Sequence, residues 1–284
     1  MHAPDQFDLM QEAVDTAKDA DAVILIVGTN SDWETEGNDR SSLALPSNQD
    51  ELVQKICNAN NNTVVVLNTG SPCEMPWIDE ANSILQCWFP GQEFGNSLSD
   101  ILFGSVNPSG KLPTTFPKKL SDTPAYSTYP GKDLQMDYEE GLFIGYRWYD
   151  RENIEPLFAF GHGLSYTNFE YSNLRAVPPK NESSVAAFEL EVINKGKLYG
   201  KEIVQGYIRV KESNIERPIK ELKKFEKIGL EPGELKKIKF ELSERDLSYW
   251  SEKDQCWKVE PAEYIFEVGS SAKEIKDSAS VWLG

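Results

Sequence analysis

Helices and apolar strands alternate through the first hundred residues of the chain. Residues 7–20 carry small and apolar side chains at helical spacing, and the β-branched run AVILIV follows at residues 22–27. Further helices are predicted over residues 47–60 and 91–104, and further strands over residues 63–67 and within residues 83–91. Such an alternation is typical of an α/β domain.

The predicted strands are apolar on both faces, because AVILIV is apolar throughout and TVVVL is apolar after its first residue. Strands of this kind favour a mostly parallel sheet with helices on its faces. Ligands of such sheets bind outside the carboxyl ends of the strands. We therefore expect the three loops that follow the strands to share one cleft; they cover residues 28–40, 67–72 and 88–93.

The pattern changes in the second half of the chain. Residues 107–163 are rich in proline, glycine and aromatic residues and show little periodicity, whereas short alternating strands separated by turns follow Thr167. Strands at this spacing favour a β-sandwich of immunoglobulin-like class, with Tyr249 and Trp250 expected in its core. We predict an α/β sandwich domain over residues 1–120, a wrapping linker over 121–166 and an all-β domain over 167–284.

Charge and length narrow the kinds of partner. The chain has 284 residues and a formal net charge of −17, so it offers no basic surface to nucleic acid or to anionic lipid. Its longest apolar runs are far shorter than the ~20 residues of a membrane helix. The first residues, MHAPDQFDLM, lack the features of a secretory signal, and both a secreted and a cytoplasmic location are compatible with the sequence. Neutral ligands such as sugars fit this charge.

The cysteines do not predict a metal site. The chain has 4 cysteines and 2 histidines, and no two cysteines stand in a C-x-x-C pair. We expect free, buried thiols.

One acidic stretch, GTNSDWETEGNDR at residues 28–40, follows the first strand. Carboxylates crowded in this way tend to raise one another's pKa, which suits acid/base chemistry. A solvated acidic loop without a chemical role is the plainer interpretation.

Five further motifs carry a family resemblance. They are NPSGKLPTTFP from residue 107, GLFIGYRWYD from 141, FAFGHGLSYTNFEY from 158, ELKKFEKIGLEPGE from 221 and ERDLSYW from 244. Together, and in this order, they resemble the C-terminal half of glycoside hydrolase family 3, specifically its β-glucosidases. The resemblance implies an α/β sandwich domain followed by a fibronectin type III-like domain, with the family's N-terminal barrel outside this chain.

The resemblance also assigns roles within the acidic stretch. Members carry an E-G-x-D-R loop that supplies the general acid/base, and here this residue is Glu36, with Glu34 as the runner-up. Asp39 and Arg40 are expected to structure the loop through an ion pair. Trp33 is a candidate for stacking on a sugar, although buried packing explains an aromatic residue equally well. A retaining glycosidase needs such an acid beside a second, nucleophilic carboxylate.

The nucleophile is not expected in this chain. Ser31-Asp32-Trp33 spells the family's S-D-W motif, but that motif belongs to the barrel, and Asp32 lies only four residues before Glu36. We interpret the match as coincidence and expect the chain alone to be inactive. His162, between two glycines, is expected in a structural turn rather than in catalysis.

The function implied by the resemblance is hydrolysis of terminal β-D-glucosyl residues with retention, without a metal or organic cofactor. The partners implied are a β-glucoside or oligosaccharide substrate and the barrel domain, and a homo-oligomer is compatible with the sequence. Two alternatives remain open at this point. One is a non-catalytic carbohydrate-binding fragment, and the other is a structural fragment that needs a separate barrel chain.

Overall fold

The computed structural model describes residues 6–284, which form two compact units. Residues 6–96 and 116–123 make the first unit, and residues 97–115 and 124–284 make the second. No helix among the described residues is long and apolar enough to cross a bilayer. The boundaries at residues 120 and 166 that the sequence suggests stay predictions.

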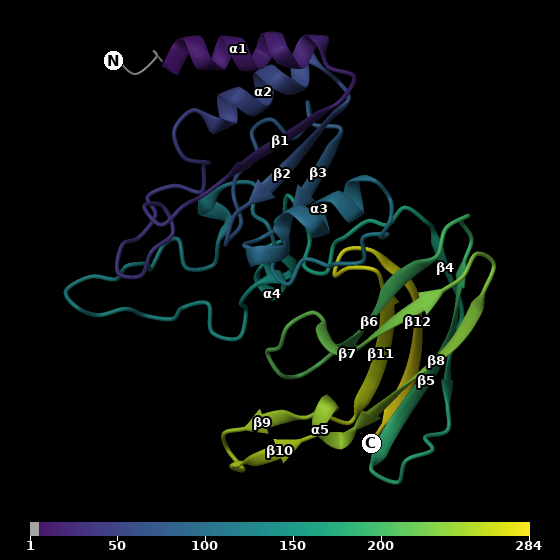
Figure 1. Cartoon of the computed structure of the whole chain (residues 1–284). Coiled ribbons are helices and arrows are strands. Elements are labelled where there is room, and N and C mark those ends of the chain that lie inside the picture. The colour runs from purple at the N-terminus through teal and green to yellow at the C-terminus, as the bar shows by residue number, and fades with distance from the viewer. Residues whose placement is uncertain (1–5) are drawn as a thin grey trace. The chain divides into compact units, whose positions relative to one another are not determined.

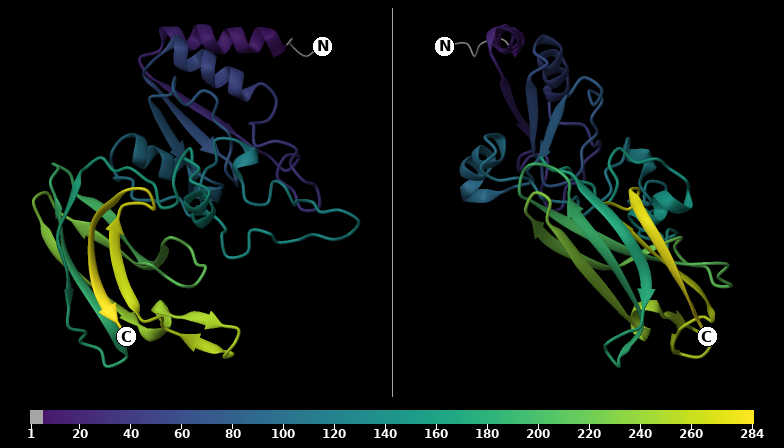
Figure 2. Two further views of the ribbon diagram at one scale, coloured as in Figure 1. Left: turned by 180° about the vertical axis from the view of Figure 1, so that it is seen from behind. Right: turned by 90° about the vertical axis from the view of Figure 1, so that its right-hand side faces the viewer.

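The first unit is built on a small parallel sheet. Its strands lie in the order β1-β2-β3, with Val23 opposite Thr63 and Val64 opposite Ser83. The helices α1 and α2 lie side by side (Figures 1 and 2), and the Asn60 side chain donates to the carbonyls of Ala17 and Ala20 at 2.8 and 2.7 Å. The predicted parallel sheet with helices beside it is confirmed. In chain order the elements are α1 (Gln6–Asp19), β1 (Val23–Gly28), α2 (Gln49–Ala59), β2 (Thr63–Asn68) and β3 (Ser83–Gln86).

Burial differs between the strands of this sheet. In the central strand β2, Val65, Val66 and Leu67 are fully buried, so this strand is covered on both faces as its sequence predicts. In the edge strand β1, Ile24 and Ile26 are 50% and 51% exposed. Although the sequence of β1 is apolar on both faces, only one face of this strand is shielded from solvent.

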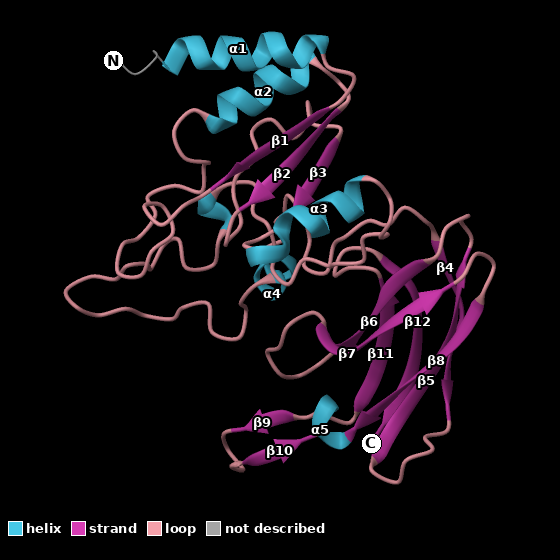
Figure 3. Cartoon of the chain, viewed as in Figure 1, coloured by secondary structure: helices cyan, strands magenta, loops and turns pink. Residues whose placement is uncertain are grey.

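The second unit is dominated by a β-sandwich of two antiparallel sheets, coloured as strands in Figure 3. One sheet has the order β12-β11-β6-β7 and the other the order β4-β5-β8. This confirms the all-β sandwich expected of the C-terminal part. The strands are β4 (Phe169–Val177), β5 (Ser184–Asn194), β6 (Gly200–Val210), β7 (Glu221–Leu230), β8 (Leu235–Ser243), β11 (Ala262–Gly269) and β12 (Ile275–Leu283).

The sandwich core is formed largely by alternate side chains of its strands, as along β5 from Phe188 onward and along β11. Phe188, Leu190 and Val192 of β5 are fully buried, and Phe188 stacks on Phe266 of β11 with ring centroids 4.5 Å apart. Inward-facing side chains from both sheets thus fill one core, as in other sandwiches of this class.

A short hairpin leaves the sandwich after the single-turn helix α5 (Glu244–Leu247). Its strands β9 (Tyr249–Ser251) and β10 (Cys256–Lys258) pair Trp250 with Trp257, and the two rings meet edge to face at 5.4 Å. Trp250 is 43% exposed, so its predicted place in the sandwich core is wrong. The ring is used instead to stabilise the hairpin across its strands.

Short helices and irregular segments complete the chain. They include η1 (Gly91–Glu93), α3 (Phe94–Leu102), η2 (Leu120–Asp122) and α4 (Tyr146–Arg151). Within the second unit, ion pairs tie the irregular segments to the sandwich. Lys111 pairs with Glu202 at 3.1 Å and Asp150 with Lys220 at 2.8 Å, both buried, and Asp150 also pairs with the partly exposed Lys273 at 3.4 Å.

Candidate active site

The loop of residues 29–40 leaves the carboxyl end of β1 and forms a tight turn around Glu36. Thr35 and Asn38 form an antiparallel bridge, so Glu36 and Gly37 occupy the two central positions of the turn. Gly37 has φ +82°, a value that the third position of a type II turn requires and that favours glycine. The turn therefore explains why the second residue of the E-G-x-D-R motif, Gly37, is a glycine.

Glu36 is exposed at the tip of this turn. Among the described residues, no hydrogen bond or ion pair is recorded for its carboxylate. A carboxylate presented in this way is available to a molecule outside the turn.

The Glu34 carboxylate, by contrast, accepts hydrogen bonds from its own unit. Its Oε1 atom accepts a hydrogen bond from the Thr29 hydroxyl and another, at 3.0 Å, from the backbone N–H of Gly70. The side chain is half-buried. Glu34 thus joins the loop after β1 to the loop after β2.

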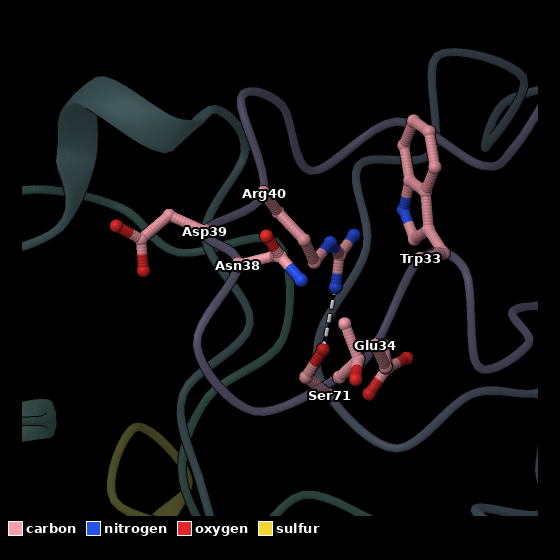
Figure 4. A pocket seen from close by; sticks show the side chains of 7 residues that line it. Trp33, Glu34, Asn38, Asp39, Arg40 and Ser71 are labelled. Carbon is pink, nitrogen blue, oxygen red and sulfur yellow. Dashed lines mark hydrogen bonds between the residues drawn. The ribbon is translucent and has the colours of Figure 1, made fainter.

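Arg40 makes a second connection between the same two loops. Its Nη1 donates to the Ser71 hydroxyl at 2.6 Å, and its guanidinium lies 5.9 Å from the centre of the Trp33 ring. Figure 4 shows the guanidinium between Trp33 and Ser71, with the Asp39 carboxylate pointing away from it. The loop-structuring roles of Asp39 and Arg40, and the ion pair between them, stay predictions.

These side chains surround an open cavity of about 300 Å³. Three N–H donors in it are buried without a hydrogen-bond partner among the described residues: Nε and Nη2 of Arg40 and Nε1 of Trp33. The lining is polar and mixed in charge, which suits hydroxyl-rich, uncharged ligands better than a phosphate. It consists of Trp33, Glu34, Thr35, Asn38, Asp39, Arg40 and Ser71 (Figure 4).

Two of the three strand-end loops meet here. Ser71 comes from the loop after β2, and it joins the loop after β1 in lining the cavity, whereas no residue of 88–93 does so. The third loop instead places the Phe89 ring beside Gly70. The sequence alone does not identify Thr29, Gly70 or Ser71 as site residues. Their position just after predicted strands is the only sequence feature that indicates a place near the site.

The other residues considered from the sequence lie in ordinary structural surroundings. Asp32 is exposed, and its backbone N–H donates to the Asn30 side chain at 3.0 Å. His162 stacks on Phe158 with ring centroids 5.2 Å apart, and burial lowers its pKa, which favours the neutral ring. These contacts are typical of a packed turn.

The four cysteines are free, but they are not all buried. Cys57 and Cys73 are buried, Cys87 is half-buried and Cys256 is exposed on β10. Burial raises the pKa of Cys73 to about 12. The prediction of buried thiols is therefore confirmed for Cys57 and Cys73 and wrong for Cys256.

Two family models match this chain. The glycosyl hydrolase family 3 C-terminal domain matches residues 6–166, and the fibronectin type III-like domain matches residues 202–272. The chain is 46% identical over 276 residues to a thermostable β-glucosidase B of Acetivibrio thermocellus, covering 96% of this chain and 36% of that protein. It is 47% identical over 264 residues to a putative β-glucosidase of Schizosaccharomyces pombe, covering 93% of this chain and 31% of that protein.

A solved structure shares the fold. The crystal structure of a β-glucosidase from Kluyveromyces marxianus in complex with glucose superposes with a TM-score of 0.94 at 39% identity, covering 100% of this chain and 34% of that one. The chain spans about a third of the length of the relatives it matches.

Proposed function

Because the chain belongs to the glycosyl hydrolase family 3 C-terminal domain family, whose model matches residues 6–166, we propose that it forms the C-terminal part of a retaining β-glucosidase. In this proposal the intact enzyme removes terminal, non-reducing β-D-glucosyl residues, and this chain supplies the general acid/base. The observation that carries the proposal is the exposed turn that presents Glu36 between two anchored residues, Glu34 and Arg40. We call residues 29–40 the acid/base loop.

The reaction has two steps. In the first, a carboxylate from the remainder of the enzyme attacks the anomeric carbon while Glu36 gives its proton to the glycosidic oxygen, so the aglycone leaves as a neutral alcohol. In the second, Glu36 takes a proton from water as the water oxygen displaces the enzyme carboxylate from the same carbon. The two inversions give net retention, and Glu36 ends in its starting, protonated state.

The contacts of the two candidate acids favour Glu36 for this role. A general acid must come within hydrogen-bond distance of the leaving oxygen. The Glu34 carboxylate already accepts two hydrogen bonds from its own unit, whereas that of Glu36 is exposed. Trp33 and Asn38 line the cavity beside the turn, and in this proposal they contact the sugar or aglycone there.

The test is Glu36→Gln in the full-length enzyme. Glutamine keeps the size of the side chain but does not donate a proton at neutral pH, so glucosides with poor leaving groups should lose about 10²–10⁴-fold in kcat/KM. Activated aryl glucosides need little protonation, so their first step should persist and the glycosyl-enzyme should accumulate as a burst. Azide attacks without a base and should restore turnover, giving β-glucosyl azide.

Glu51→Gln is the matched control, because Glu51 is an exposed glutamate of α2 that pairs with Lys55 within one helix. It should behave like the parent enzyme. Parent-like kinetics of Glu36→Gln with every leaving group would refute the assignment of the acid.

The second measurement uses the 284-residue chain by itself. Because the proposal places the nucleophile in the remainder of the enzyme, the purified chain should not hydrolyse an aryl β-glucoside. Appreciable turnover would overturn this division of the catalytic residues and would make Asp32 the nucleophile candidate to test.

A further inference from the structure

Glu34 connects the acid/base loop to the sheet through a single carboxylate oxygen. Thr29 follows β1 directly and Gly70 lies two residues beyond β2, and both donate to Oε1 of Glu34. The strands themselves end side by side, because Gly28 is opposite Asn68 and the Thr29 N–H donates to the Asn68 carbonyl at 3.2 Å. The Glu34 carboxylate therefore continues the pairing of β1 and β2 beyond the last backbone hydrogen bond.

The Glu34 carboxylate and the Phe89 ring lie close to Gly70. A Cβ atom at residue 70 would lie 2.5 Å from Oε2 of Glu34 and 2.6 Å from the Phe89 ring. Both carboxylate oxygens of Glu34 thus lie close to the Gly70 backbone, and the Phe89 ring also borders the space that a Cβ atom would fill. Glycine at this position is required by close approach rather than by backbone conformation.

The acid/base loop is attached on both sides of its turn. Glu34 contacts Gly70 just before the Thr35–Asn38 bridge, and Arg40 contacts Ser71 just after it. Both contacts reach consecutive residues of one loop. The turn between Glu34 and Arg40 is short and closed by the Thr35–Asn38 bridge. The direction in which this turn projects therefore depends on the positions of the Glu34 and Arg40 contacts.

We infer that Glu34 is a positioning residue, whose carboxylate holds the acid/base loop on the Gly70 backbone and thereby fixes where Glu36 meets the leaving oxygen. This inference rests on the proposed function, because it concerns the aim of the same acid. Proton transfer depends steeply on geometry, and a misplacement of about 1 Å costs on the order of 10²-fold in rate.

The expected signature of lost positioning is a dependence on the leaving group. In the full-length enzyme, Glu34→Ala removes the carboxylate that accepts from Thr29 and Gly70 and should lower kcat/KM by roughly 10²-fold for glucosides that need protonation. Activated aryl glucosides should lose much less. A variant that merely folds less well would lose activity equally for both substrate classes, so the ratio of the two separates positioning from stability.

Conservative replacement and azide give two further readouts. Glu34→Gln keeps a carbonyl oxygen that accepts from Thr29 and Gly70, so it should recover most of the activity that alanine loses. Azide should accelerate the second step of Glu34→Ala much less than that of Glu36→Gln, because the displaced Glu36 still supplies part of the base catalysis.

Gly70→Ala tests the same contact from the other loop. The added methyl group displaces the Glu34 carboxylate or the Phe89 ring and should reproduce the leaving-group dependence of Glu34→Ala. Gly95→Ala is the matched control, since a Cβ atom there meets nothing within 4 Å, and it should leave the kinetics unchanged.

The outcomes separate this inference from the proposed function. If Glu34→Ala and Gly70→Ala keep the parent's rates for all leaving groups while Glu36→Gln loses activity, Glu34 is not a positioning residue and the acid assignment stands. If azide restores Glu34→Ala while Glu36→Gln resembles the parent, Glu34 is itself the acid/base and both statements fail.

Discussion

The acid/base loop and the β-sandwich are held in shape by different forces. The sandwich depends on burial, because side chains such as Phe188 and Phe266 are fully removed from water. The loop is mostly exposed and depends on a few directed hydrogen bonds, those of Glu34 and Arg40 above all. Directed contacts can fix one atom's position without a core, which is what a catalytic carboxylate on a loop requires.

The two kinds of sheet show a related difference. The sandwich strands β5 and β11 bury their inward side chains completely, whereas β1 of the parallel sheet leaves Ile24 and Ile26 half-exposed. Removing apolar atoms from the two places should therefore have unequal effects on stability.

The largest effect is expected for Phe266→Ala in the sandwich. It leaves a cavity against Phe188 and should lower the free energy of unfolding of the second unit by about 3–5 kcal/mol. Ile26→Ala on β1 should cost the first unit only about 1 kcal/mol, because half of the side chain is already in water. Hydrogen exchange resolved by peptide measures each unit separately. Equal losses would show that β1 is covered in solution.

A smaller loss is expected when a directed contact is broken inside the second unit. The side chains of Asp150 and Lys220 are only 6% and 11% exposed and pair at 2.8 Å. Asp150→Asn leaves the Lys220 charge buried without its counter-charge and should cost about 3 kcal/mol, the lower end for a broken buried pair.

Glu182→Gln removes a carboxylate from an exposed position of the same unit and should change the free energy of unfolding by less than about 0.5 kcal/mol. Urea titration of both variants gives the comparison. If Asp150→Asn unfolds at the parent's urea midpoint, this buried pair contributes nothing to stability.

The smallest perturbation is chemical labelling of the thiols. Burial raises the pKa of Cys73 to about 12, so at about pH 8 only about 10⁻⁴ of it is thiolate, and it should react with iodoacetamide only when the first unit opens. Cys256, exposed in the second unit, should react at the rate of a small-molecule thiol. Peptide mass spectrometry over time gives both rates, and similar rates would mean that the first unit opens readily.

Both folds could be predicted from the sequence because each depends on local periodicity. Two-sided apolar runs indicated the parallel sheet, and alternation after Thr167 indicated the sandwich. The half-exposed face of β1 could not be predicted in this way, because its sequence reads as buried on both sides. Trp250 was placed in the core for a similar reason, since exposure depends on where the hairpin of β9 and β10 projects.

The candidate site was predicted less completely. The turn around Glu36 is formed by neighbouring residues, and the positive φ angle of Gly37 within that turn accounts for the glycine there. The role of Glu34 depends on Gly70, thirty-six residues away, and on the absence of a side chain there. A contact of that kind has no periodic pattern in the sequence, so the hydrogen bonds that distinguish Glu34 from Glu36 could not be predicted from it.

The Thr35–Asn38 bridge has a practical consequence for redesigning the loop. It isolates Glu36 and Gly37 as a replaceable tip on a fixed stem, since the stem's attachments lie outside the bridge. Each residue inserted within the tip extends its reach by at most ~3.3–3.6 Å while the stem keeps its place. We therefore expect insertions in the tip to change how far the Glu36 carboxylate reaches while the contacts of Glu34 and Arg40 persist.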